Sequence, residues 1–265
     1  MSYNVLASPH IGNSRLLTFG LLTLDNNKKE FNEEANNYEG IINIISGSCN
    51  ITIEGEDFEK VHYTNVGGRN NIFEGKPEMV YFPINSKIKI YNIKEENLIC
   101  GIARAQSNET YNPQVVREND VEIKKSGRDN WQREVYIGIG PDFPAGKLMM
   151  GETESPPGNW SGYPSHKHDD SNLSNEANME EVYFMQFKPT GGYAVGGIYY
   201  KFNNTNQIVS DLKMIQHNQV FCVPGGYHFI APAPGFRLRY IWMFCGDREF
   251  GAWNVDPELA WLTNN

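Results

Sequence analysis

The feature that most constrains this chain is a recurring series of short apolar runs separated by turn residues. Runs rich in Ile, Val, Tyr and Phe, such as GIINIISGS, KIKIYNI and EEVYFMQF, are punctuated by Gly, Asn, Asp and Pro along the 265 residues. Strands of this length and density predict an all-β sandwich or barrel. Ile51 and Ile53 alternate with polar neighbours, as do Ile88 and Ile90, which predicts sheets with one solvated face.

Charge and composition exclude several classes of partner. The net charge of −9 argues against nucleic acid and anionic membranes, because both require clustered Lys and Arg. No apolar run approaches the roughly 18 residues of a membrane span, and the N-terminus lacks the pattern of a signal peptide. The four cysteines lie in strand-like runs without a CxxC pair, which predicts reduced, buried thiols. We therefore expect a soluble, cytoplasmic protein.

The two halves of the chain resemble each other. VYFPINSKIKI in the first half and VFCVPGGYHFI in the second share the order strand, Pro, turn, strand, and the polar segment 108–134 lies between the halves. A duplicated barrel is the simplest explanation. We predict an N-terminal barrel over residues 1–120, with a connecting arm and no metal ligands, and a C-terminal metal-binding barrel over residues 121–265. Counted from Pro83 and Pro224, Lys87 occupies the position of His228.

Four residues of the second half have the chemistry of metal ligands. His166 and His168 lie one residue apart, so on a strand both point the same way, roughly 6.5 to 7 Å apart. Glu181 begins the run EVYFMQF, and His228 follows a Pro-Gly-Gly turn. Each motif alone has a structural explanation without metal, but their joint order favours a site for a zinc- or iron-type cation. Such a site keeps a coordination position open for water or a substrate oxygen.

Several motifs together resemble a known family. PPGNWSGYPSHKHD, MEEVYF, VPGGYH and NVDPELAW are similar to the 5-deoxy-glucuronate isomerase family of bacterial inositol catabolism, and the resemblance covers nearly the whole chain. A more distant resemblance is to 4-deoxy-L-threo-5-hexosulose-uronate ketol-isomerase. The resemblance implies an all-β bicupin, with two jelly-roll-like cupin barrels in tandem. It also implies that His166, His168, Glu181 and His228 bind the metal.

The same resemblance implies a reaction. It predicts a metal-dependent aldose–ketose isomerase that converts 5-deoxy-D-glucuronate to 2-deoxy-5-keto-D-gluconate through a metal-stabilised enediol. Zinc is the first expectation for the divalent metal, with manganese and iron as alternatives. The candidates for catalytic proton transfer are Tyr183, Tyr199, Tyr240 and Lys167. The polar segment 169–179 is expected to form a loop over the barrel mouth.

The chain departs from the family pattern where a substrate carboxylate could bind. Gly197 and Gly225 stand where the family has arginines, and the last barrel strand instead carries Arg237 and Arg239. An arginine fork is the usual way to hold a carboxylate, and two alternatives stay open for Arg237 and Arg239: one of them takes this role, or both are surface residues. Two other functions suit the same ligands, a cupin-type Fe(II) oxygenase and a non-catalytic sugar-binding cupin. A homo-oligomer is considered, but the sequence does not fix the oligomeric state.

Overall fold

The structure, a computed structural model, describes residues 1–171, 176–201, 208–248 and 251–263. In this part of the chain the regular elements are β-strands and three short 3-10 helices, η1 (Glu118–Asp120), η2 (Asp129–Trp131) and η3 (Pro257–Leu262). The predicted all-β class is confirmed. None of the helices in the described ranges has the length and apolar character needed to cross a membrane.

The chain forms two compact units whose boundary is not a single point. The first unit contains Met1–Glu122 and Tyr136–Gly151, and the second contains Ile123–Val135 and Glu152–Asn265. Part of the polar segment that was interpreted as a connecting arm therefore belongs to the second unit. The following residues, to Gly151, group with the first unit. The division at residue 120 as a domain boundary stays a prediction.

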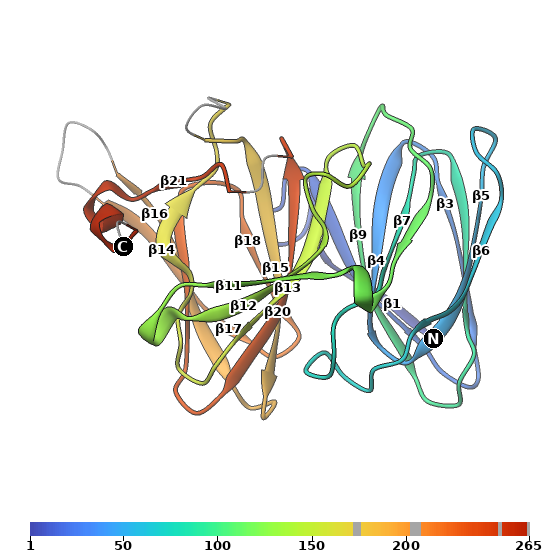
Figure 1. The fold of residues 1–265 in the computed structure, drawn as a ribbon, viewed down its shortest axis with the longest axis horizontal. Helices are drawn as coiled ribbons and strands as arrows, with labels where there is room; N and C mark the ends of the chain where they lie inside the picture. Colours follow the sequence, from blue (N-terminus) through green and yellow to red (C-terminus); the bar gives the residue numbers. More distant parts are fainter. Residues whose placement is uncertain (172–175, 202–207, 249–250, 264–265) are drawn as a thin grey trace. The chain divides into compact units, whose positions relative to one another are not determined.

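Two antiparallel sheets make up most of the first unit (Figure 1). The six-stranded sheet has the order β1-β2-β9-β4-β7-β10 and the four-stranded sheet the order β3-β8-β5-β6. The strands are β1 (Ser2–Ala7), β2 (Leu17–Leu24), β3 (Glu30–Ala35), β4 (Tyr38–Ser46), β5 (Ser48–Glu54), β6 (Val61–Gly67), β7 (Met79–Phe82), β8 (Ser86–Asn92), β9 (Leu98–Gln106) and β10 (Gln114–Val116).

The core of the first unit is apolar and comes from both of its sheets. Leu22 and Ile42 from the six-stranded sheet join Ile51 and Ile90 from the four-stranded sheet in one buried cluster. Along β8 the isoleucines are buried and the lysines between them are exposed, which confirms the predicted solvated face. Burial of each isoleucine contributes about 1.5 to 3 kcal/mol, so the alternation favours the observed register over one shifted by a residue.

Two further sheets lie mostly in the second unit, although parts of β12 and β13 fall within the Tyr136–Gly151 segment that groups with the first unit. Their orders are β11-β12-β13-β20-β15-β18 and β17-β16-β19-β14-β21. The strands are β11 (Glu122–Ser126), β12 (Arg133–Ile139), β13 (Leu148–Ser155), β14 (Ser161–Lys167), β15 (Met179–Lys188), β16 (Tyr193–Lys201), β17 (Ile208–Gln216), β18 (Gln219–Val223), β19 (Tyr227–Pro232), β20 (Arg237–Gly246) and β21 (Asn254–Val255).

Strand pairing in the second unit places the predicted ligands. β14 pairs with β19 so that His166 lies directly opposite His228. β15 belongs to the other sheet, where Glu181 lies opposite Val223 of β18 and Phe244 of β20. The histidines and the carboxylate therefore come from different sheets and meet in the interior of one unit. All four cysteines are buried and free, as predicted.

Candidate metal centre

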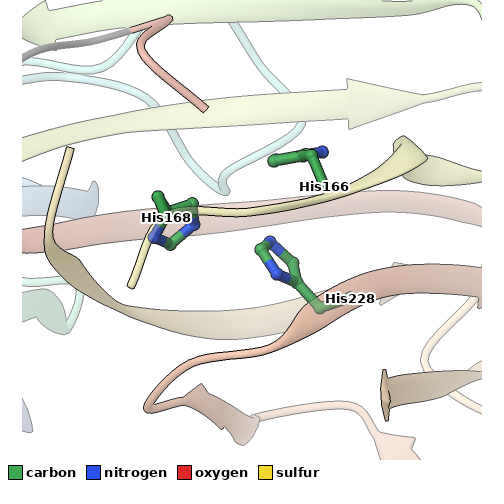
Figure 2. Close-up of side chains that lie close together, drawn as sticks. All are labelled: His166, His168 and His228. Atoms are coloured by element: carbon green, nitrogen blue, oxygen red, sulfur yellow. The ribbon is translucent and has the colours of Figure 1, made fainter. Parts of the chain in front are cut away.

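Three histidines of the second unit converge on one point (Figure 2). The ring centroids of His166 and His228 are 4.7 Å apart, those of His168 and His228 are 5.0 Å apart, and those of His166 and His168 are 6.0 Å apart. One ring nitrogen from each histidine lies within 4.8 Å of the others, and all three side chains are buried. Strands β14 and β19, with the residue that follows β14, thus hold three imidazoles in a cluster.

The backbone fixes the orientation of each of these imidazoles. Nδ1 of His166 is 2.9 Å from the Pro164 carbonyl oxygen, Nδ1 of His168 is 2.7 Å from that of Met179, and Nδ1 of His228 is 3.1 Å from that of Gly226. A carbonyl oxygen only accepts, so each Nδ1 carries the proton. In the neutral ring the lone pair is then on Nε2, the atom that binds a metal.

A single carboxylate lies against two of the histidines. Oε2 of Glu181 is 3.2 Å from Nε2 of His168 and 3.3 Å from Nε2 of His228, and it accepts a hydrogen bond from the Tyr183 hydroxyl at 2.5 Å. Burial raises the pKa of Glu181, but the neighbouring imidazoles of His168 and His228 outweigh burial and lower the pKa to about 2. The carboxylate is therefore ionised at neutral pH.

The histidines differ in protonation. Burial, together with the nearby His228 and His168, lowers the pKa of His166 well below its usual value, so this ring is neutral. Burial also lowers the pKa of His168, but its hydrogen bond to Glu181 outweighs burial and the pKa is raised overall. A cation that binds His168 through Nε2 would displace the proton shared by this pair, which makes the affinity of the site for metal depend on pH.

The donor set fits a divalent transition metal or zinc. Nε2 of His228 is buried and makes no hydrogen bond within the described residues, and such an atom calls for a partner. Three imidazole nitrogens and one carboxylate oxygen suit zinc, manganese or iron, whereas calcium and magnesium prefer oxygen ligands. Metal–nitrogen bonds of about 2.1 Å hold two nitrogens at most about 4.2 Å apart.

A cavity of about 250 Å³ adjoins the cluster, close to the lower end of the size range of small-ligand pockets, about 300 Å³. His166 and Glu181 form part of its wall, so a ligand in the cavity would reach the metal ligands. The other lining residues are Lys124, Lys125, Ser126, Arg133, Val135, Thr153, Gly162, Tyr183, Tyr240, Trp242, Phe244 and Trp253. All of them belong to the second unit.

Tyr183 and Tyr240 are the two predicted catalytic residues that line this cavity. Their ring centroids are 5.2 Å apart, and the hydroxyl of Tyr240 is 2.7 Å from the hydroxyl of Ser161. Burial raises the pKa of both tyrosines, so both are protonated at neutral pH. Each can therefore donate a proton or a hydrogen bond to a ligand.

Lys167 lies outside the cavity wall, although it separates two histidines of the cluster. Its Nζ makes ion pairs of 2.8 Å with Asp169 and 2.7 Å with Glu176. Asp169 in turn accepts a hydrogen bond of 2.8 Å from the backbone N–H of Gly226. This network holds the turn that precedes His228. Residues 172–175 of the predicted loop over the barrel mouth lie outside the described residues.

Tyr199 is also outside the cavity wall. Its hydroxyl donates to the Asp256 carboxylate, and its ring stacks on Tyr227 with centroids 5.4 Å apart. Burial, reinforced by the hydrogen bond to Asp256, raises the pKa of Tyr199. The structure thus brings together two of the four predicted catalytic side chains. The catalytic assignment of all four stays a prediction.

The arginines of the last barrel strand do not line the cavity. Arg239 is 1% exposed, so it is not a surface residue, and it pairs with Glu152 at 2.8 Å and with Glu154 at 3.2 Å. Arg237 also pairs with Glu154. Because side chains alternate along β20, Tyr240 and the other cavity residues of this strand point the opposite way.

Sequence reasoning missed Arg133, which does line the cavity. It is the first residue of β12, in a segment that was interpreted as a connecting arm. The available signal was a basic residue at the start of the apolar run VYIGIG.

Comparisons with known proteins identify the family. The chain is 28% identical over 231 residues to 5-deoxy-glucuronate isomerase of Geobacillus thermodenitrificans, covering 87% of this chain and 80% of the relative. It is 26% identical over 234 residues to the Bacillus subtilis (strain 168) enzyme of the same name, covering 88% and 82%. These names confirm the prediction of an enzyme of the isomerase class.

Solved structures confirm the bicupin fold. An IolB-like protein from Salmonella typhimurium has a TM-score of 0.87 at 20% identity and covers 97% of this chain and 94% of its own. Oxalate decarboxylase of Lactobacillus farciminis has a TM-score of 0.66 at 12% identity, covering 92% and 81%. Each barrel is built here from open sheets. The family model described as KduI/IolB matches residues 3–262, and this chain belongs to the KduI/IolB family.

Proposed function

We propose that this protein is a metal-dependent aldose–ketose isomerase that converts 5-deoxy-D-glucuronate to 2-deoxy-5-keto-D-gluconate. The curated relatives carry the name of this activity. The observation that carries the proposal for this chain is the meeting of three buried imidazoles with the Glu181 carboxylate, beside a cavity whose wall includes His166 and Glu181. That arrangement is chemically suited to a Lewis acid in contact with a small ligand.

The reaction needs no co-reactant. One proton moves between C2 and C1 of the sugar and one moves between the two oxygens, so atoms and electrons balance without an oxidant or reductant. His166, His168, Glu181 and His228 would hold the divalent cation. When bound, the cation supplies a Lewis acid that polarises the carbonyl oxygen and makes the neighbouring C–H bond more acidic.

The tyrosines of the cavity supply a source of protons. Tyr183 donates to Oε2 of Glu181, and burial keeps its hydroxyl protonated. We assign Tyr183 the exchange of the proton between the sugar oxygens, because its hydroxyl is the acid that lies against the ligand cluster. Tyr240, anchored by Ser161, orients the sugar from the same wall. This division of roles rests on position and protonation state together.

Elemental analysis of the purified protein followed by proton NMR with 5-deoxy-D-glucuronate tests the proposal. We expect close to one zinc, manganese or iron per chain, and resonances of the ketose that disappear when a chelator removes the metal. Oxygen uptake is measured in the same samples, because an Fe(II) oxygenase would consume oxygen whereas an isomerase would not. A metal-loaded protein that forms no ketose would refute the proposal.

A further inference from the structure

Arg133 is a partly buried cation that the proposed chemistry does not use. It lines the same cavity as His166 and Glu181. Its Nη1 donates to the carbonyl oxygen of Trp131 at 3.1 Å and to that of Tyr163 at 3.0 Å. These two bonds fix one nitrogen of the planar guanidinium to the backbone. The orientation of the whole group is therefore set before any ligand arrives.

The remaining edge of this guanidinium has no partner in the part of the chain that the structure describes. Nε and Nη2 make no hydrogen bond there, and no carboxylate pairs with the side chain. Burial lowers the pKa of Arg133, and the groups that oppose this effect are the hydroxyls of Tyr240 and Tyr183. A charge removed from water without an anionic partner is destabilising, so a retained one indicates an anion from outside the chain.

The charges of the cavity wall also favour an anionic ligand. Its wall contains the basic side chains of Lys124, Lys125 and Arg133 and one acidic side chain, Glu181. Glu181 is already engaged by His168 and a tyrosine hydroxyl. The whole chain has a net charge of −9, so a basic wall is a local feature and not a consequence of composition. Such a wall attracts small anions and raises their local concentration.

We propose that Arg133 binds the carboxylate of the sugar acid through its Nε and Nη2 edge, while the carbonyl end of the sugar reaches the histidine cluster. This inference rests on the proposed function for its substrate class. A guanidinium presents two parallel N–H donors that match the two oxygens of a carboxylate. Arg133 thus takes the role that Gly197 and Gly225 cannot fill, and it is a specificity residue on β12.

The test compares two sugars that differ only at C6, 5-deoxy-D-glucuronate and 5-deoxy-D-glucose. Ligand-observed NMR on the purified, metal-containing protein gives the dissociation constant of each. We expect wild type to bind the acid more tightly. In Arg133→Gln the affinity for the acid falls about 10- to 100-fold, the range of a charge-assisted hydrogen-bond pair, and the affinity for the neutral sugar changes less than about twofold.

Two further variants test whether the affinity for the acid depends on the shape of the guanidinium or only on its positive charge, and whether loss of any cation has the same effect. Arg133→Lys keeps the charge but loses the fork, so its affinity for the acid should lie between those of wild type and Arg133→Gln. Lys213→Met removes an exposed cation of β17 and should change neither affinity. Metal content and melting temperature are measured for each variant. If Arg133→Gln does not fold, the comparison of the two sugars in wild type and in Arg133→Lys decides.

The outcomes distinguish this inference from the proposed function. Equal binding of the two sugars by wild type, or full affinity for the acid in folded Arg133→Gln, would overturn the role of Arg133. In the same spectra, ketose resonances report turnover. Preference for the acid that depends on Arg133, without any ketose, would support the carboxylate site and defeat the isomerase. Ketose formation with an affinity for the acid that does not depend on Arg133 would support the isomerase and overturn the carboxylate site.

Discussion

The two units share a proline-containing turn but bury different side chains on the strand that follows it. In both, a proline-containing turn leads into a strand, and the second residue after that proline has a positive φ, 58° at Asn85 and 86° at Gly226. Beyond the turn the units diverge. Lys87 is exposed on β8, whereas His228 is 0% exposed on β19. Equal distance from the proline therefore does not place a side chain on the same face.

The difference follows from the period of two in a β-strand. In β8 the buried side chains alternate from Ser86, and Ile88 and Ile90 fill an apolar core. In β19 His228 and Ile230 are fully buried instead, which is an offset of one residue. A shift of one residue exchanges the inner and outer faces of a strand. One unit thus buries hydrocarbon where the other buries imidazole.

The largest difference between the units is expected when one histidine is removed from each. We expect His228→Ala to lose bound metal and to lower turnover at least about 10⁴-fold, since catalysis through a Lewis acid needs the complete site. His62→Ala, which removes an exposed first-unit histidine hydrogen-bonded to Thr52, should change neither. Elemental analysis and NMR turnover measure both effects. A full complement of metal in His228→Ala would show that the cluster is not the metal site.

Substitution of two tyrosines tests whether catalysis depends on the cavity wall, which contains Tyr183 but not Tyr199. Tyr183→Phe removes the hydroxyl that donates to Glu181 and should lower kcat about 10²- to 10³-fold, a usual contribution of one proton-transfer group. Tyr199→Phe removes a hydroxyl that donates to Asp256 outside the cavity wall, and it should lower kcat less than about threefold. Metal content should stay at the wild-type level in both. Equal losses of kcat in the two variants would contradict the assignment of proton transfer to Tyr183.

The apolar core of the first unit should matter for stability alone. Ile51→Ala leaves a cavity among fully buried neighbours and should lower the free energy of unfolding by about 2 to 5 kcal/mol. Lys89→Ala, on the exposed face of β8, should change it by less than about 0.5 kcal/mol. Denaturant titration measures the loss, and turnover per folded molecule should be unchanged. A lower kcat in folded Ile51→Ala would give the first unit a part in catalysis.

The smallest effect is expected at the ion pairs beside the cluster. Lys167→Met breaks the contacts with Asp169 and Glu176, and because Lys167 is partly exposed the loss of stability should be about 1 kcal/mol. Asp169 still accepts from Gly226, so the turn before His228 persists and metal affinity should fall only severalfold. Metal titration with a competing chelator measures this. Complete loss of turnover with metal retained would instead make Lys167 a catalytic residue.

Much of the molecule could be predicted from local patterns. Alternation at Ile88 and Ile90 specified a half-buried strand, and the order of His166, His168, Glu181 and His228 specified donors suited to a metal. These predictions depend on properties that neighbouring residues carry with them: side-chain chemistry, the period of two, and the conformational freedom of glycine in the turn before His228.

Other features were decided only when distant segments met. The register of β14 against β19 placed His166 opposite His228, and β15 brought Glu181 to them from the other sheet. Lys167, a predicted catalytic residue, lies outside the cavity wall and pairs with carboxylates, whereas Arg133, which sequence reasoning missed, lines the cavity. The sequence alone determined which donors and cations the chain carries. Tertiary structure decided which of them share one cavity, since burial and charge pairing depend on contacts between residues far apart in the chain.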